Sequence, residues 1–395
     1  MQTNKSFADR IDWSLAFILF LFFIVSLVAI SSAQTSGQYL TNFVPKQGLF
    51  YILSIGMIGV LMYFDPEQYK KMAYYLYGLG ILSLFILMIA PAGPEQIGEP
   101  INGAKAWFRT PVLNMQPAEF MKTFYILALA KMISSHHEKF TLKTIKTDLI
   151  LLGKIGVLLL IPLAFILDQP DMGTALVFIA ITLAIIVVAG ISWKIILPSF
   201  GGVAVIGVTL LWMAINMQEF LTNTFGIQRY AFARIYTWFD PYSYADGDAY
   251  NLIAAMNAIG SGQVFGKGYQ GREVYVPENH TDFIFTVISE DFGFIGASTV
   301  IILFFMLIYH LTKITLQLKD TFSTYVCAGI IAMITFHVFQ NIGMTIQLLP
   351  ITGIPLPFIS YGGSSLIGNM MAIGIVFSMK FHHKTYMFGS DKDDQ

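Results

Sequence analysis

Charged residues are scarce in this chain of 395 residues, and cysteine is almost absent. Asp, Glu, Lys and Arg make up 12% of the sequence, hydrophobic residues make up 55%, and the mean hydropathy is +0.65. Because soluble domains carry about 25% charged residues, this composition excludes a soluble enzyme and a disordered scaffold. The 23 basic and 24 acidic residues nearly cancel, which excludes a nucleic-acid partner. The single Cys327 excludes an intrachain disulfide. The apolar composition leaves a polytopic membrane protein as the remaining class.

Ten apolar stretches are long enough to cross a bilayer, whose core of about 30 Å needs roughly 20 apolar residues per helix. They are residues 14–33, 48–64, 72–91, 117–135, 148–167, 172–190, 195–217, 284–309, 323–347 and 364–381. The fourth and eighth contain charges. We include both because the loop charges alternate properly only if both stretches cross. The sequence predicts an all-α polytopic membrane protein with ten transmembrane helices, folded as one integral membrane domain over residues 1–395.

The basic residues orient these spans. With both termini in the cytoplasm, most of the 23 basic residues lie on the inner side, and the short outer loops hold only Lys46, Lys105 and Arg109. The orientation predicts an outer loop at 92–116, a large outer loop at 218–283 and a re-entrant outer loop at 350–363. We expect the first span to be retained rather than cleaved as a signal peptide, because its apolar run is long.

Charged residues inside the spans are costly, at about 2.5–3.5 kcal/mol each on insertion scales. Glu119 and Lys122 are three residues apart, so they share a helix face and can pair. The pair either neutralises its own charge inside the bundle or lines a polar cavity open to the outside. Glu290 and Asp291 are adjacent and point about 100° apart, so we expect one to face the interior and the other to meet Lys313 or water near a broken helix.

Two short segments place carboxylates at the predicted outer surface. In QPDMGTA, residues 169–175, Asp171 can cap the sixth span. In PENHTDFIF, residues 277–285, Thr281 or Asp282 can cap the eighth span. The functional alternative for Asp282 is a general base held at the membrane surface beside an outer cavity.

Two further segments are rich in glycine or proline. GSGQVFGKGYQG, residues 260–271, lacks the spacing of a phosphate-binding P-loop, but its backbone N–H groups and Lys267 could wrap a phosphate; otherwise it is a flexible turn. PITGIPLPFISYGGSS, residues 350–365, cannot form an ordinary helix at membrane depth. Such a backbone must be buried in protein or line a water cavity, so we expect a structured re-entrant loop.

These motifs together resemble the SEDS proteins (shape, elongation, division and sporulation), which include RodA and FtsW. The resemblance rests on PITGIPLPFISYGGSS, QPAEFMK at 116–122, QPDMGTA, AIGSGQVFGKG at 258–268 and PENHTDFIF, which occur in the family's order over essentially the whole chain. It implies a ten-span peptidoglycan glycosyltransferase that polymerises lipid II, works with a class B penicillin-binding protein and belongs to an elongasome or divisome in the bacterial cytoplasmic membrane. The short tails and the PENHTDFIF wording favour the RodA elongation branch.

The resemblance also assigns residues. Asp282 matches the aspartate regarded as essential for catalysis. The positions expected to bind substrate are Trp107, Lys105, Arg109, Glu119, Lys122, Asp171, Lys267, Ser360 and Ser364. Three positions depart from the family pattern: Lys105 and Ala106 stand where paired arginines are common, Gln263 replaces a usual glycine, and Asp291 replaces a common glutamate.

The implied reaction suits the residues. A carboxylate such as Asp282 can take the proton of the attacking sugar hydroxyl, which typically contributes about 10²–10⁴-fold to the rate. The departing pyrophosphate needs positive charge from Lys122, Lys267 or Arg109, or from a divalent cation, Mg²⁺ or Mn²⁺, that Asp282 could help to hold. Attack opposite the leaving group inverts the anomeric centre.

Three other functions stay open: a flippase or transporter of lipid-linked cell-wall precursors, an ion-coupled transporter using Glu119 and Lys122 as a proton relay, and a scaffold that docks a partner enzyme. A transporter needs access from both sides of the membrane. The polar motifs here cluster on the outer side only, and this asymmetry favours an enzyme.

Overall fold

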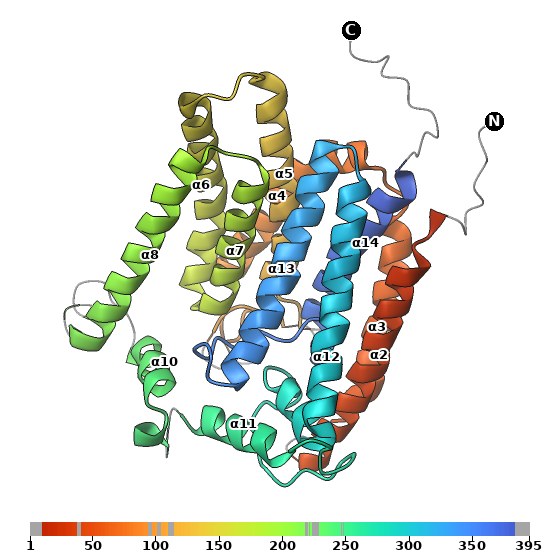
Figure 1. The fold of residues 1–395 in the computed structure, drawn as a ribbon, viewed down its shortest axis with the longest axis vertical. Helices are drawn as coiled ribbons and strands as arrows, with labels where there is room; N and C mark the ends of the chain where they lie inside the picture. Colours follow the sequence, from red (N-terminus) through yellow and green to blue (C-terminus); the bar gives the residue numbers. More distant parts are fainter. Residues whose placement is uncertain are drawn as a thin grey trace.

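The computed structural model describes residues 10–37, 41–93, 97–100, 104–109, 114–217, 220, 222, 229–245, 247 and 249–383. Over this part the chain is helical, and its only strand-like feature is an isolated bridge between Phe108 and Met115. The helices are α2 (Trp13–Ala33), η1 (Gln34–Ser36), α3 (Phe43–Leu61), α4 (Pro66–Ile89), α5 (Pro117–Lys139), α6 (Ile145–Asp168), α7 (Met172–Val188), α8 (Trp193–Asn216), α10 (Arg229–Phe239), η2 (Tyr242–Tyr244), α11 (Tyr250–Ser261), α12 (Ile284–Gln317), α13 (Thr321–Thr345) and α14 (Gly363–His382) (Figure 1).

Each predicted span overlaps one long helix among the described residues. Eight of these helices are long and apolar enough to cross a membrane. The exceptions are α5, which carries charged residues, and α7, which has 17 residues. The protein is therefore a multi-pass membrane protein, whereas the number of ten spans stays a prediction.

Some helix starts differ from the prediction because capping residues, not hydropathy, set them. The second span was expected from residue 48, but α3 begins at Phe43, where the Asn42 side chain accepts a hydrogen bond from Val44 N. The third was expected from residue 72, but α4 begins at Pro66, after a capping box formed by Asp65 and Gln68.

Helix α5 lies at the centre of the bundle and contacts α4, α6, α7, α13 and α14. Most of its residues are buried, although it is the least apolar of the ten helices that match predicted spans. Helix α8 is its opposite: it packs mainly on α10 and α6 at the edge of the molecule (Figure 1), and its apolar side chains such as Leu197 and Val205 are exposed. Exposed apolar side chains along a long helix are what a lipid environment accommodates.

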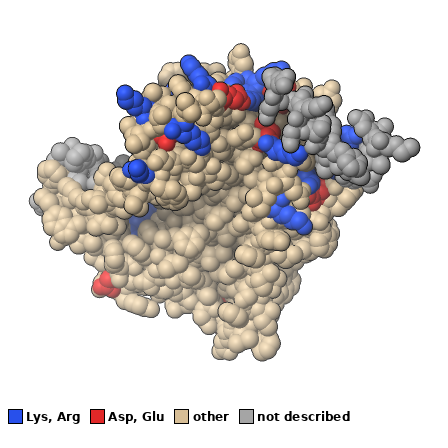
Figure 2. Space-filling model, turned by 45° about the horizontal axis from the view of Figure 1, so that its top comes forward, with Lys and Arg blue, Asp and Glu red and all other residues tan. Residues whose placement is uncertain are grey.

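The two ends of the described chain meet at one end of the bundle, where the Arg10 guanidinium lies 5.8 Å from the centroid of the Phe381 ring. Figure 2 shows Lys and Arg gathered around this end, while the flanks below it carry few charges. The opposite end holds α10, α11 and the start of α12 (Figure 1). The motifs singled out from the sequence meet at that second end.

Candidate active site

The segment between α13 and α14 is a folded, non-helical loop. Its backbone carbonyls accept hydrogen bonds from polar side chains of three helices. Ser26 Oγ donates to Ile359 O (2.8 Å), Tyr51 OH to Phe358 O (2.5 Å) and Gln340 Nε2 to Pro350 O (2.9 Å). A buried loop needs such partners because unpaired backbone groups are costly away from water. The loop expected at 350–363 is thus structured, and its re-entry into the membrane stays a prediction; we call this segment the re-entrant loop.

Asp282 lies just before α12 and does not cap it. The N-cap of α12 is Phe283, and no side chain caps this helix. The hydroxyl of Thr281 also points elsewhere, since it donates to Glu278 O (3.2 Å). The expectation that Thr281 or Asp282 caps the eighth span is therefore wrong, because the helix begins at Ile284, one residue after the start that an Asp282 cap would give and two after the start that a Thr281 cap would give. Helix capping therefore does not explain the presence of an aspartate at position 282.

The carboxylate of Asp282 faces the re-entrant loop. A Cβ added to Gly353 would lie 3.3 Å from Asp282 Oδ2, and Gly353 has a φ of +71°, a conformation that favours glycine. The backbone carbonyl of Asp282 accepts a hydrogen bond from Asn341 Nδ2 (2.8 Å). Among the described residues, no hydrogen bond reaches the carboxylate oxygens themselves. The group is thus placed firmly by its backbone, and its side chain is left open to a ligand.

Burial raises the pKa of Asp282 to about 7, and the negative charge of Glu278 acts in the same direction. The positive charge of Arg234 opposes the shift, and Asp171 adds a smaller upward contribution. Desolvation disfavours the charged carboxylate, and neighbouring carboxylates disfavour it further. A carboxylate with a pKa near 7 can accept a proton at neutral pH and bind it well, which is what a general base requires.

His280, two residues before Asp282, packs against aromatic rings. Its ring stacks on Phe43, with centroids 4.6 Å apart and planes 3° apart, and Tyr361 lies 5.7 Å away. Burial lowers the pKa of His280, so the ring is neutral at neutral pH. Tyr361 N also donates to His280 O (2.9 Å), which ties this stack to the re-entrant loop.

Asp171 caps α7 as expected and also joins two motifs. Its Oδ1 accepts from Thr174 N (2.9 Å), and its Oδ2 accepts from Thr174 Oγ1 (2.8 Å) and Gln116 Nε2 (3.0 Å). Gln116 N in turn donates to Ser364 Oγ (2.9 Å) at the start of α14. The motifs that begin α5, α7 and α14 are therefore held together by hydrogen bonds near Asp282.

Ser360 and Ser364 both serve the backbone. Ser360 Oγ donates to Thr281 O (2.7 Å) and accepts from Leu356 N (2.8 Å). Ser364 Oγ donates to Asn114 O (2.9 Å). Both serines are buried. Ser360 holds the residue before Asp282, and Ser364 holds the segment that precedes α5. Direct contact of either serine with substrate stays a prediction.

Glu119 and Lys122 form a sealed pair inside the bundle. Lys122 Nζ donates to both carboxylate oxygens of Glu119, at 2.9 Å each, and lies 3.0 Å from His337 Nε2. His337 Nδ1 lies 2.8 Å from Met333 O, so Nδ1 carries the ring proton and Nε2 accepts from the lysine. Glu119 is 5% exposed and Lys122 1%. The pairing expected from the sequence is present, and the pair does not line an open cavity in this conformation.

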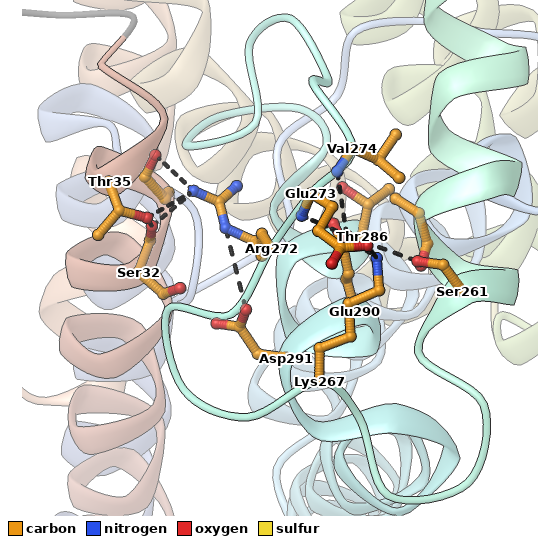
Figure 3. Close-up of polar contacts among 12 residues, drawn as sticks. Ser32, Thr35, Ser261, Lys267, Arg272, Glu273, Val274, Thr286, Glu290 and Asp291 are labelled. Atoms are coloured by element: carbon orange, nitrogen blue, oxygen red, sulfur yellow. Dashed lines mark hydrogen bonds and ion pairs between the residues drawn. The ribbon is translucent and has the colours of Figure 1, made fainter.

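Lys267 and Glu290 link the segment between α11 and α12 to α12 itself (Figure 3). Lys267 Nζ donates to Glu290 Oε1 (2.8 Å) and to Glu273 Oε2 (3.0 Å). The backbone N–H groups of Glu273 (2.9 Å) and Val274 (3.1 Å) donate to the same Glu290 oxygen. These acceptors raise the pKa of Lys267, so it stays charged. We call Lys267, Glu290, Arg272 and Asp291 the outer clamp.

Arg272 and Asp291 form the second half of the outer clamp (Figure 3). Arg272 Nη2 donates to the carbonyls of Ser32 (2.6 Å) and Ala33 (3.0 Å) at the end of α2, and its Nε lies 3.9 Å from Asp291 Oδ1. Asp291 therefore faces Arg272, and the expectation that Glu290 or Asp291 meets Lys313 is wrong. The predicted break in this helix is present at Gly293, which has a φ of 63°.

The glycine-rich loop 260–271 packs on α12 and is neither a phosphate cradle nor a loose turn. Lys267 N donates to Glu290 O and Gly268 N to Asp291 O, both at 2.9 Å. A Cβ on Gly262 or Gly266 would overlap the α12 backbone. The glycines allow two backbones to touch, and the N–H groups that a phosphate would need are already used.

Lys105 and Arg109, in the segment between α4 and α5, each contact a different part of the chain. Lys105 Nζ donates to Met88 O (2.8 Å) and Ala90 O (2.6 Å), so it satisfies carbonyls at the C-terminal end of α4. Arg109 forms an ion pair with Glu99 and is 47% exposed. Trp107 is partly buried. The structure does not bring these three side chains onto Asp282, so their contact with substrate stays a prediction.

The model of the cell cycle protein family FtsW, RodA and SpoVE matches residues 8–385. Peptidoglycan glycosyltransferase MrdB of Escherichia coli (strain K12) is 32% identical over 391 residues, covering 96% of this chain and 97% of that protein. Probable peptidoglycan glycosyltransferase FtsW of Geobacter sp. (strain M18) is 30% identical, covering 94% and 96%. The chain belongs to this family. It is a SEDS protein.

Solved structures of SEDS relatives share this fold. A mutant of the rod shape determining protein RodA from Thermus thermophilus has a TM-score of 0.66 and 25% identity, covering 94% of this chain and 97% of that one. A chain from a peptidoglycan synthase complex that coordinates polymerization and crosslinking has a TM-score of 0.75 and 24% identity, with coverage of 94% and 97%. The fold described above is therefore that of solved members.

The described residues of this SEDS chain do not form a metal site by themselves. No group of three or more His, Cys, Asp or Glu side chains in the described ranges could hold a metal ion. Asp282 has carboxylate neighbours in Glu278 and Asp171, but the oxygens of Asp171 already accept three hydrogen bonds. The described residues around Asp282 therefore do not fit the divalent cation, Mg²⁺ or Mn²⁺, that the sequence suggested.

Several residues of this SEDS site were missed in the sequence. Arg234 and Glu278 act on Asp282 through charge, Gln116 holds Asp171, and Asn341 holds the backbone of Asp282. One signal was available: Gln340 and Asn341 are two adjacent amides at the outer end of an apolar span, where polar groups need partners. Arg234 carries no such signal in its sequence neighbourhood.

Proposed function

We propose that this chain is a peptidoglycan glycosyltransferase that polymerises lipid II at the outer face of the bacterial cytoplasmic membrane, with Asp282 as the general base. Peptidoglycan glycosyltransferase activity is that of its named relatives. One observation carries the assignment of Asp282. Its carboxylate has a pKa raised to about 7, receives no hydrogen bond among the described residues, and faces the re-entrant loop at the end of the bundle.

The geometry supports a proton transfer at this carboxylate. The 4-hydroxyl of the acceptor sugar attacks the anomeric carbon of the donor sugar, and its proton passes to Asp282. The bond from the anomeric carbon to the pyrophosphate oxygen breaks, and the lipid-linked pyrophosphate leaves. Attack from the side opposite the leaving group inverts that carbon, which gives a β linkage.

Arg234, on α10, is the cation best placed to assist the departing pyrophosphate. Its charge reaches Asp282, because it lowers the pKa of that group. Lys122, Lys267 and Arg109, the cations expected for this role, are not among the charges that shift the pKa of Asp282. A cation near the developing charge stabilises the transition state electrostatically.

The proposed orientation places both termini in the cytoplasm and Asp282 outside. It is supported by the positive-inside pattern and by the Lys and Arg residues at the end of the bundle where Arg10 and Phe381 meet (Figure 2). In this orientation the isoprenoid tail of lipid II lies in the bilayer and its sugars reach the end that holds Asp282. A class B penicillin-binding protein of the elongation machinery is the proposed partner.

A polymerisation assay tests this function. Purified protein in nanodiscs is incubated with lipid II, with and without a single-span class B penicillin-binding protein, and glycan chains are resolved by gel. We expect weak polymerisation alone and a large gain with the partner. Proteoliposomes containing labelled lipid II provide the contrasting test. Translocation of lipid II without polymer in any condition would favour a flippase and contradict the proposal.

A further inference from the structure

Asn341, on α13, connects the two chain segments that meet at the proposed base. It is fully buried, with 0% exposure. Its Nδ2 donates to Asp282 O and to Ile354 O, each at 2.8 Å. One amide nitrogen therefore binds the segment that carries Asp282 and the segment of the re-entrant loop that faces it.

The chemistry of the amide fixes this arrangement. Both partners are carbonyl oxygens, which only accept, so the NH₂ end must face them. The amide oxygen of Asn341 is buried and has no hydrogen-bond partner among the described residues. The side chain thus makes two donated hydrogen bonds, while its amide oxygen stays buried without a donor.

The two carbonyls lie on either side of the contact that shapes the site. Ile354 follows Gly353, whose added Cβ would lie 3.3 Å from Asp282 Oδ2. If the donors of Asn341 were removed, two buried carbonyls would be left without a partner and the segments would separate or admit water. Either change moves the Asp282 carboxylate relative to the loop.

We propose that Asn341 is a positioning residue, which sets the place of the Asp282 carboxylate by holding its backbone and the re-entrant loop together. This inference rests on the proposed function, because it takes Asp282 as the base. Displacing a reacting group by about 1 Å can cost on the order of 10²-fold in rate. Loosening the loop would also admit water beside Asp282, which is desolvated in the native protein.

The test compares Asn341→Leu with Gln340→Leu in the full chain with its partner, using lipid II as substrate. Gln340 is the matched control: it is adjacent on α13, is buried, and donates to Pro350 O (2.9 Å), which lies outside the contact between Gly353 and Asp282. We expect Asn341→Leu to lower kcat by about 10–100-fold with KM changed little, and Gln340→Leu to change kcat by less than about 3-fold. In a variant that retains activity, the acid limb of the pH profile should also move to lower pH.

If Asn341→Leu does not accumulate in the membrane, Asn341→Ser replaces it under the same criteria, since its hydroxyl can donate to only one carbonyl. Equal losses of kcat in the Asn341 and Gln340 variants, or an unmoved acid limb, would overturn the inference. Asp282→Asn is measured beside them. If Asp282→Asn is inactive while Asn341→Leu keeps its kcat, only this inference fails; if Asp282→Asn keeps its kcat, the proposed base fails.

Discussion

Two carboxylates of this protein, Glu119 and Asp282, have opposite surroundings. Glu119 binds Lys122 through both oxygens at 2.9 Å, and the lysine continues to His337. Asp282 receives no hydrogen bond on its carboxylate among the described residues, and nearby negative charge adds to the cost of its burial. The first carboxylate is paired with a buried ammonium group, whereas the second is held in conditions that favour a proton.

The number of partners around each carboxylate indicates whether it can still bind a proton or a substrate. A buried charge with all its partners is costly to disturb and has no free capacity for a substrate. A carboxylate with few partners costs stability but retains its ability to bind a proton. The comparison therefore supports the proposal that Asp282 takes part in the reaction, and it predicts that Glu119 and Lys122 stabilise the bundle.

The largest stability effect should come from breaking the sealed pair. Glu119→Ala leaves Lys122 charged and buried, which should cost roughly 3–5 kcal/mol and lower folded yield and activity together. The double variant Glu119→Gln with Lys122→Met should restore both, because no unpaired charge remains. Thermal melting and polymerisation are measured in parallel. A double variant that melts normally but stays inactive would show that the pair takes part in catalysis.

Gly353→Ala should sharpen the other side of the comparison. The new Cβ lies 3.3 Å from Asp282 Oδ2 at a φ of +71°, so the loop or the carboxylate must shift, and activity should fall by about 10-fold or more. Gly37→Ala is the matched control, since Gly37 has a φ of +67° and nothing within 4 Å. Both variants should lose about 1 kcal/mol of stability from the backbone. Equal activities of the two would mean that the Gly353 contact is unimportant.

The outer clamp is an intermediate case. Lys267→Met removes the cation from Glu290, but two backbone N–H groups still donate to that carboxylate, so we expect a loss of only about 1–3 kcal/mol. Lys313→Met on the exposed surface of α12 serves as the control and should leave melting unchanged. A large rise in the KM for lipid II without loss of stability would instead support the substrate-binding role expected for Lys267.

Arg109 should give the smallest effect. Its pair with Glu99 is exposed, and such pairs contribute about 0–1 kcal/mol. Arg109→Gln should therefore melt within about 1 kcal/mol of the wild type and polymerise at a similar rate. A KM raised about 10-fold at unchanged stability would restore Arg109 to the pyrophosphate site that the sequence predicted.

The sequence predicted much of the fold because membrane helices have a strong local signal. Each predicted span overlaps a helix, and the break near Glu290 and the pairing of Glu119 with Lys122 follow from helical spacing. Helix starts were less accurate, since side-chain caps such as Asn42 and Asp65 extend helices beyond the apolar run.

The site was predicted less completely because it is assembled from distant segments. Asn341 reaches Asp282 across 59 positions and Gln116 reaches Asp171 across 55, and local spacing carries no record of such contacts. The packing of the glycine-rich loop on α12 was missed for the same reason. A glycine that binds phosphate and one that touches another backbone have the same local sequence, and only the packing on α12 distinguishes them.

The raised pKa of Asp282 predicts how the free energy of unfolding changes with pH. The pKa of Asp282 is raised from 3.8 to about 7 in the folded protein. Between about pH 4 and 7 the folded state therefore binds more protons than the unfolded state, and wild-type stability falls as the pH rises through this window. Asp282→Asn lacks this titration, so its melting temperature should exceed that of the wild type increasingly from pH 4 to 7 and by a constant amount above pH 7.

The most direct test measures polymerisation and melting of wild type and Asp282→Asn from pH 5 to 8, each with its partner. We predict a wild-type rate that rises with pH through about 7, and an Asp282→Asn protein that melts no lower than wild type at pH 8 yet polymerises at least about 10²-fold more slowly. An Asp282→Asn protein that polymerises lipid II at near wild-type speed would contradict the assignment of Asp282 as the base.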